Sequence, residues 1–244
     1  MRKRKSLREI YSYLKENDIC IFNLDDFSRI FNLKKNYAAL VIFRLKNEGY
    51  IKEFEKGKYV LEGSEDTLSI GCFSIRPSYI SFKTALGYYK FLKNDDNEIY
   101  LATLKRKAPF RFRSHIIRYV FLKTHRFFGF TDEMVNKNYI KIALPEKAII
   151  DSIMLPEYGP EIEDLIKILT DRKNELYIDR LVKYAIRMND KSLVARLAFM
   201  LYLAGIDVDI DDKYLPKFYI KLVPDRERKG RWINRFKIID NLEI

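Results

Sequence analysis

Cysteine, histidine and tryptophan are all scarce in this chain of 244 residues, which has two cysteines, two histidines and one tryptophan. Cys20 and Cys72 stand in separate segments without CxxC spacing, so neither a disulfide framework nor a structural zinc site is expected. His115 and His125 have no Cys or carboxylate at ligand spacing. We therefore expect two small buried thiols in a reducing compartment, with no metal and no cofactor.

Long apolar runs are also missing. No run approaches the ~20 residues that a membrane-spanning helix needs. The basic start of the chain resembles the front of a signal peptide, but Glu9, Lys15 and Glu16 interrupt any apolar region behind it. These absences predict a cytoplasmic protein without a membrane partner.

Signatures of the common enzyme classes are absent as well. The chain has no GxxxxGK[ST], GxGxxG or GxSxG motif. Glu146 and Asp151 are five positions apart on one predicted helix, so they point in different directions rather than forming a catalytic pair. The aspartates at 207–212 lack the Gly and Glu of a calcium loop. We expect no catalytic residue and no enzymatic activity.

What the chain has in excess is positive charge. Its formal net charge is +12, and 48% hydrophobic residues supply a core. Residues 1–62 carry 14 Lys+Arg against 9 Asp+Glu, and residues 63–154 carry 15 against 9. Residues 155–244 are nearly balanced, with 17 against 16. Such an excess favours polyanionic partners, nucleic acid first, and locates that surface in the first two thirds of the chain.

Hydrophobic periodicity divides residues 1–62 into three helices and a hairpin. An apolar stripe begins at Leu7, and Asn23 or Asp25 can cap a second helix. A third helix is predicted over 35–48 and ends at Gly49, where the period changes to two. This order is typical of a winged helix-turn-helix domain, which we assign to residues 1–62.

In such a domain the third helix enters the major groove, its N-terminal end nearest the bases. Lys and Asn suit guanine and adenine edges, and basic turns and arms suit the backbone or minor groove. The predicted duplex-DNA contacts are Lys34, Lys35, Asn36 and Tyr37 at the helix start, Arg44 further along it, Lys56 and Lys58 in the hairpin, and Arg2, Lys3, Arg4 and Lys5 in the arm.

Residues 68–244 are predicted to form a second, α+β domain. A helix is expected over about 80–92, followed by strand-like segments from 98 to 143 that indicate an antiparallel sheet. A helical subdomain is expected over about 160–217, and the tail at 218–238 is strand-like.

A basic segment lies within the predicted sheet. Between Lys105 and Arg126 there is no acidic residue, and aromatic residues alternate with basic ones. The segment is either a second nucleic-acid surface or a half-buried sheet with one apolar and one solvated basic face, and the pattern leaves both open. The candidate residues are Lys105, Arg106, Lys107, Arg111, Arg113 and Arg118.

Four short motifs resemble the AbiEi-type antitoxins of type IV toxin–antitoxin systems. Ser78–Tyr89 resembles the helix that opens their conserved region, and Phe127–Phe130 resembles their aromatic-Gly element. Ile142–Asp151 is similar to their A-x-P-E-K-A-l-l-D helix start, and Arg231–Asn234 resembles their closing strand. These motifs follow a predicted winged helix here, as they do in the family.

The resemblance implies an antitoxin that represses its own operon. It also implies a second domain that counteracts a nucleotidyltransferase-type toxin without having to bind it directly. Oligomerisation on DNA is left open. Two alternatives stand beside this interpretation: a nucleic-acid-processing enzyme that uses the winged helix for delivery, and a scaffold whose winged helix binds protein.

Overall fold

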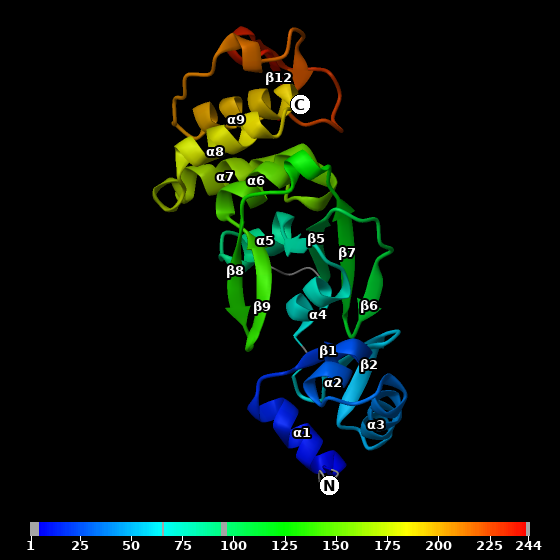
Figure 1. Ribbon diagram of the computed structural model, residues 1–244. Coiled ribbons are helices and arrows are strands. Elements are labelled where there is room, and N and C mark those ends of the chain that lie inside the picture. Colours follow the sequence, from blue (N-terminus) through cyan, green and yellow to red (C-terminus); the bar gives the residue numbers. More distant parts are fainter. Residues whose placement is uncertain (1–4, 65, 94–96, 243–244) are drawn as a thin grey trace.

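The computed structural model describes residues 5–64, 66–93 and 97–242. The molecule is elongated, with the N-terminal unit at one end and a small C-terminal sheet at the other (Figure 1). A six-stranded sheet and a layer of helices lie between them. The chain is therefore a mixed α+β protein.

The N-terminal unit combines three helices with a three-stranded sheet. Its strand order is β1-β3-β2, and both pairings are antiparallel. The elements are α1 (Leu7–Glu16), β1 (Ile21–Asn23), α2 (Leu24–Ile30), α3 (Lys35–Asn47), β2 (Ile51–Glu55) and β3 (Lys58–Leu61).

Local capping explains where these helices start and stop. Asn23, rather than Asp25, caps α2, and its side chain accepts from the Asp26 amide at 2.9 Å. Gly49 follows α3 with a φ of 76°, a left-handed conformation that glycine adopts without strain. The side chains of Leu14, Phe27 and Leu45 are fully buried in a core of their own, separate from the main core.

The central sheet has the order β6-β7-β5-β4-β9-β8. Its elements, with two short helices, are α4 (Thr67–Ser74), β4 (Ser78–Ile80), α5 (Phe82–Tyr88), β5 (Glu98–Thr103), β6 (Phe110–Phe112), β7 (His115–Phe121), β8 (Phe130–Val135) and β9 (Asn138–Ala143). The single helix expected over 80–92 is wrong in its bounds, because β4 precedes a shorter α5.

The expectation of an antiparallel sheet holds only in part, because three of the five pairings are antiparallel and two are parallel. β5 pairs with β7 in parallel, and β4 pairs with β9 in parallel. The chain passes from β5 to the edge strand β6 and then returns, so that β7 lies between them and runs in the direction of β5. Sequence alternation predicts strands but carries no information about this order.

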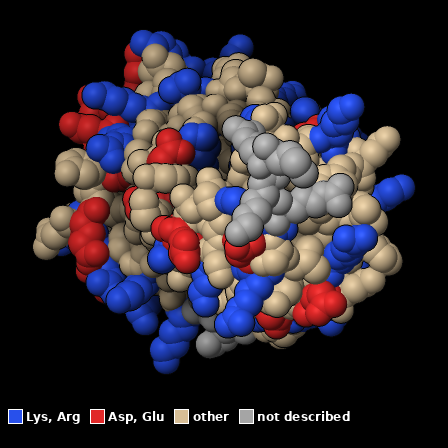
Figure 2. All heavy atoms as spheres, turned by 60° about the horizontal axis from the view of Figure 1, so that its bottom comes forward, with Lys and Arg blue, Asp and Glu red and all other residues tan. Residues whose placement is uncertain are grey.

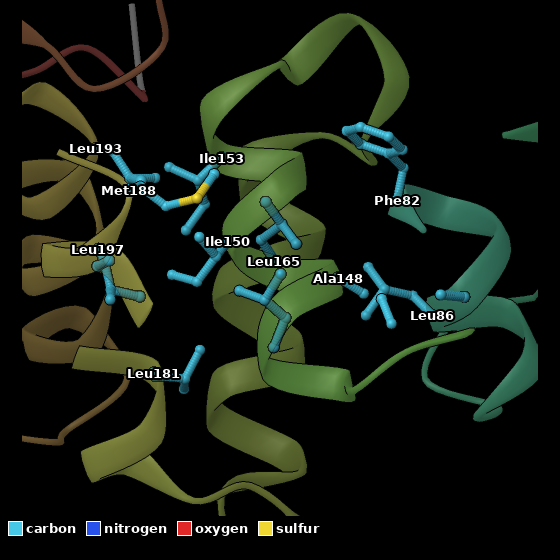
Figure 3. Close-up of a cluster of buried hydrophobic side chains, with 14 of the residues drawn as sticks. Phe82, Leu86, Ala148, Ile150, Ile153, Leu165, Leu181, Met188, Leu193 and Leu197 are labelled. Atoms are coloured by element: carbon cyan, nitrogen blue, oxygen red, sulfur yellow. The ribbon is translucent and has the colours of Figure 1, made fainter. Parts of the chain in front are cut away.

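Helices cover one end of the sheet and build the main core. They are α6 (Pro145–Met154), α7 (Ile162–Asp171), α8 (Ile178–Arg187) and α9 (Lys191–Leu203). α6 lies at the centre: Ala148 faces Leu86 of α5, whereas Ile153 faces Met188 (Figure 3). Burial on both sides explains why almost every residue of α6 is buried, its charged ones included.

The tail forms a small sheet of three short strands against α9. The strands are β10 (Ile220–Lys221), β11 (Arg231–Ile233) and β12 (Ile238–Asp240), in the order β10-β12-β11. None of the helices in the described part of the chain combines the length and apolar character needed to traverse a bilayer.

Candidate nucleic-acid interface

The outer face of α3 is open to solvent at the N-terminal end of the molecule. Lys34 is the exposed N-cap residue of the helix, and Asn36 and Arg44 are also exposed. The opposite face of α3 packs into the N-terminal core through Ala38, Val41, Ile42 and Leu45. The helix period therefore directs three of the predicted DNA-binding side chains outward.

Two large apolar side chains lie on the same outer face. Leu40 is 43% exposed and Phe43 is 59% exposed. With Asn36 they occupy positions i, i+4 and i+7, which fall on one side of a helix. Sequence reasoning missed this stripe because it considered only Lys34–Tyr37 and Arg44 as candidate contacts on this helix.

Lys35 and Tyr37 are less available than the other residues predicted at this helix start. The Lys35 ammonium lies 2.7 Å from a carboxylate oxygen of Asp25 on α2, and both side chains are largely exposed. An exposed pair of this kind contributes little, about 0–1 kcal/mol, so a phosphate can replace Asp25. Tyr37 is half-buried against the N-terminal core.

Unpaired positive charge in this unit is spread rather than concentrated. Among the described residues of the first 62, the cations with no carboxylate within salt-bridge distance include Arg8, Lys15, Lys34, Arg44 and Lys56. Figure 2 shows this end of the molecule, where acidic side chains lie between the basic ones. A duplex bound here would meet separate cations and not one continuous basic patch.

The predicted basic arm is described only at its last residue. Arg2, Lys3 and Arg4 lie outside the described residues. The Lys5 ammonium lies 4.3 Å from the centre of the Tyr13 ring, a cation–π contact that brings it back against α1.

The hairpin differs from the predicted DNA-contacting wing. Its two-residue turn is Lys56-Gly57, with Lys56 exposed, whereas Lys58 belongs to β3. The Lys58 ammonium donates to Glu55 at 2.6 Å and to the Ser74 carbonyl at 2.5 Å. Lys58 is therefore engaged within the fold beside α4 rather than free at the tip of the hairpin, and its contact with DNA stays a prediction.

The same hairpin joins the N-terminal unit to the central sheet. Glu55 also accepts from Lys107, and the Phe54 ring packs edge-on against Phe73 and Phe112. Burial alone raises the pKa of the Glu55 carboxyl, but hydrogen bonds from Lys107 and Lys58 outweigh it and lower that pKa below its ordinary value. We call these contacts of Phe54, Glu55, Lys58 and Lys107 the joint between the N-terminal unit and the central sheet.

Glu55→Gln is expected to lower the free energy of unfolding by about 1–3 kcal/mol at neutral pH, because two half-buried ammonium groups lose their shared anion. Since the folded-state pKa of Glu55 is lowered, its contribution is present above the unfolded pKa and is lost as pH falls through the folded value. Urea unfolding at neutral and acid pH measures both effects. Glu62→Gln, which removes an exposed partner of Lys52, is the control and should change little.

The second basic segment does not form one surface. Lys107 is bound to Glu55 at the joint, and Arg118 pairs with Glu98, its guanidinium Nε donating at 2.7 Å. Both cations therefore already have a carboxylate partner within the fold, and their contact with nucleic acid stays a prediction. The four that stay exposed are Lys105, Arg106, Arg111 and Arg113.

The aromatic residues of this segment are explained by packing. Phe110 and Tyr119 stack with ring centres 6.3 Å apart, and the Tyr119 hydroxyl donates to the Gly71 carbonyl of α4 at 3.2 Å. Gly71 lies so close to the sheet that an added Cβ would be 3.0 Å from Leu101. The structure therefore favours the half-buried sheet over the stacking surface, and α4, which the sequence pattern did not indicate, covers it.

The Pro145–Asp151 motif builds a buried polar network. The Lys147 ammonium and the Asp151 carboxylate pair within α6, and both side chains are fully inaccessible. Asp151 also accepts from the hydroxyls of Tyr79 at 3.0 Å and Ser81 at 2.7 Å. Burial lowers the pKa of Lys147, and burial followed by the nearby carboxylate raises the pKa of Tyr79 well above its ordinary value.

Glu146 has separate partners. Its carboxylate accepts from the Tyr177 amide at 2.9 Å and lies 3.4 Å from the Arg180 guanidinium. Glu146 and Asp151 therefore connect α6 to different neighbours. In the described residues, no three His, Cys, Asp or Glu side chains are grouped so as to hold a metal ion.

A cleft of about 630 Å³ lies beside α4 and the β8–β9 pair. Arg76, Asp132, Tyr139 and Lys141 contribute to its wall. The Lys141 ammonium lies 2.7 Å from an Asp132 oxygen, so this carboxylate is already paired. Of the residues named, the cleft therefore offers the Arg76 cation and the Tyr139 ring beside a Lys141–Asp132 ion pair, rather than two facing carboxylates.

Comparison with known proteins adds information about the fold. No family model matches the chain, and no curated protein matches it in sequence. A solved structure with a similar fold is the crystal structure of the RV2827C protein from Mycobacterium tuberculosis, with a TM-score of 0.62 and 10% sequence identity. The match covers 99% of this chain and 94% of that one. The two chains thus share their architecture over nearly their whole length.

Proposed function

We propose that the protein is a DNA-binding transcriptional regulator whose N-terminal unit is a winged helix-turn-helix. The observation that carries the proposal is the outer face of α3, which presents Asn36 and the unpaired cations Lys34 and Arg44 to solvent. The order helix, strand, helix, helix, hairpin supports the same assignment.

In the proposed complex α3 lies in the major groove and the surrounding cations bind phosphates. Asn36, one residue into α3, is positioned to pair with an adenine edge. Arg8, Lys15 and Lys56 supply backbone contacts that are independent of sequence. Because Lys58 is held at the joint, Lys56 is the main cation of the hairpin in this proposal.

The apolar stripe on α3 gives the proposal a sequence preference. An apolar side chain in the major groove contacts the C5-methyl group of thymine, which only this base of DNA carries. Leu40 and Phe43, flanked by Asn36, therefore favour sites rich in A·T pairs over G·C pairs.

Thymine-to-uracil replacement is expected to weaken binding without changing the charge of the duplex. The duplex is first selected from a random library at moderate salt. Each contacted methyl that is removed should cost about 0.8 kcal/mol, or about fourfold in Kd. Fluorescence anisotropy of the thymine and uracil duplexes measures the difference, and the double variant Leu40→Ala/Phe43→Ala should abolish it. An unchanged Kd would contradict the methyl contact while leaving phosphate binding intact.

For the second domain we propose the role of an antitoxin that lacks enzymatic activity of its own. The proposal rests on the resemblance of Ile142–Asp151 and the other motifs to AbiEi-type antitoxins. It implies autorepression of an operon that also encodes a nucleotidyltransferase-type toxin, in the cytoplasm. Co-expression with the product of the adjacent gene tests it: relief of growth arrest supports the antitoxin role, and unrelieved arrest contradicts it.

The same stripe favours one other function. Exposed Leu40 and Phe43 can equally pack against another protein, which would make the N-terminal unit a protein-binding scaffold. Sedimentation of the wild type and of Phe43→Ala, without DNA, separates the two. Self-association that is lost in the variant, together with no duplex binding at low salt, would support the scaffold.

A further inference from the structure

An aromatic and basic surface lies at the end of the molecule opposite α3. Residues 217–237 contain 8 Lys+Arg and 2 Asp+Glu, although the last third of the chain is nearly balanced overall. Figure 1 shows that β12 and the C-terminus are at the far end from α1 and α3. This surface is therefore separate from the proposed duplex-binding face.

The strand register explains why aromatic rings gather there. Trp232 lies opposite Ile239 across the β11–β12 pair, and Lys221 lies opposite Ile239 across the β10–β12 pair. Directly paired residues share a face of a sheet, so Trp232 and Lys221 are on the same side. Tyr219, two residues before Lys221, contacts Trp232 with ring centres 4.7 Å apart.

The rings are not covered by the rest of the described chain. Trp232 is 55% exposed, and Phe218, next to Tyr219, is 79% exposed. The buried Ile239 lies on the same face of the sheet as Trp232, yet a large part of the indole is left in water. Neighbouring exposed aromatic rings of this kind indicate a binding surface.

Cations surround the rings and have no carboxylate partner among the described residues. The Arg228 guanidinium lies 5.8 Å from the Trp232 ring centre, and the Lys237 ammonium lies 5.5 Å from that of Tyr219. Arg228 donates to the Tyr219 carbonyl at 3.1 Å, and Lys237 donates to the Asn234 side chain at 2.6 Å. Both cations are held in place by neutral acceptors, which leaves their charge available to an anion.

We propose that this surface, formed by Phe218, Tyr219, Arg228, Trp232 and Lys237, binds single-stranded nucleic acid. Unpaired bases stack on exposed aromatic rings, and the phosphates between them lie against the flanking cations. A duplex cannot use the rings in this way, because its bases are stacked and paired. The cations Arg228 and Lys237, which have no carboxylate partner among the described residues, disfavour a second copy of the same surface as the partner, since like charges would face each other.

The sole tryptophan of the chain reports directly on this site. Titration of the full-length protein with single strands of about 12 nucleotides should quench Trp232 emission in a saturable way, and added salt should reverse the quenching. Titrations with oligo(rU) and oligo(dT) distinguish RNA from single-stranded DNA. A fully paired duplex of equal length should leave the Trp232 emission unchanged.

Variants then separate binding from the fluorescence signal. With a labelled single strand, Trp232→Ala should weaken binding about tenfold, and Arg228→Glu should weaken it and reduce its salt dependence. Tyr177→Ala is the matched control. Like Trp232, Tyr177 is an exposed aromatic residue beside an arginine: its side chain is 65% exposed, and the Arg180 guanidinium lies 4.4 Å from its ring centre. Neither surface variant should alter duplex binding through α3.

Two results would overturn the proposal. One is Trp232 emission that neither single strand changes at low salt. The other is an emission shift with protein concentration alone, which would mean that a second copy covers the rings.

Discussion

Asp151→Ala is expected to lower the free energy of unfolding by about 3–5 kcal/mol, a large fraction of the stability of a domain this size. The change removes the only anion beside the Lys147 ammonium among the described residues, and that ammonium is fully buried. The Tyr79 and Phe128 rings remain, with centres 5.7 and 4.9 Å away, together with the charges of Arg126 and Arg187, which disfavour a further cation. The substitution also leaves the Tyr79 and Ser81 hydroxyls without the carboxylate that accepts their hydrogen bonds.

The loss of unfolding free energy caused by Asp151→Ala should become smaller as pH rises. Burial already lowers the pKa of Lys147, and loss of the adjacent carboxylate lowers it further. Between the folded-state pKa of Lys147 in the variant and that in the wild type, only the variant's native state has released this proton, so the variant's stability rises with pH relative to the wild type. Urea unfolding at neutral pH and at about pH 9.5 measures this slope.

Two controls test whether burial is responsible. Asp151→Asn keeps the shape and a hydrogen-bond acceptor, so it should cost less than Asp151→Ala. Asp25→Ala removes the partner of Lys35 in an exposed pair of 2.7 Å, and its expected cost is below about 1 kcal/mol. Equal losses from Asp151→Ala and Asp25→Ala would mean that the α6 pair is not buried in solution.

Reversing two charges on α3, with Lys34→Glu and Arg44→Glu together, is expected to weaken duplex binding about 100-fold or more at low salt. Each lost phosphate contact lowers the slope of log K against log salt by about 0.9, so the slope should fall by about two. Filter binding over a salt series measures both. Glutamate at position 34 sits at the positive end of α3, so the helix itself is not weakened by this change.

The matched control has the same change in net charge at the other end of the molecule. Lys183→Glu and Lys191→Glu alter exposed positions of α8 and α9 and should leave duplex binding nearly unchanged. A similar loss in both double variants would mean that overall charge, rather than the α3 face, holds DNA. An unchanged salt slope in the α3 variant would contradict the proposed recognition helix.

Local signals along the chain predicted much of the N-terminal unit. The stripe beginning at Leu7, the cap at Asn23 and the stop at Gly49 are all short-range features, and the structure contains helices bounded by them. β1 was not anticipated, because three residues are too few to display a period. Its pairing with β3 depends on the tertiary fold.

Which of the predicted contact residues the fold leaves exposed could be inferred from the sequence only in part, for the same reason. Exposure of Lys34, Asn36 and Arg44 follows from the helix period. The helix period does not predict that Lys58 and Lys107 are held within the fold. Their common partner Glu55 lies 52 residues from Lys107 in the sequence, and only the tertiary structure brings them together. An excess of basic residues in a segment gives no indication of which of them the fold neutralises.

By itself, the sequence determined the absence of a disulfide framework and of a membrane-length apolar run, and the helical periods that turn one face of α3 outward. Tertiary structure alone decided the strand directions, the burial of Lys147 with Asp151, and the meeting of Tyr219 with Trp232. The physical reason is range: periodicity and capping act within a few residues, whereas burial, ion pairing and ring contacts depend on which distant segments are packed together.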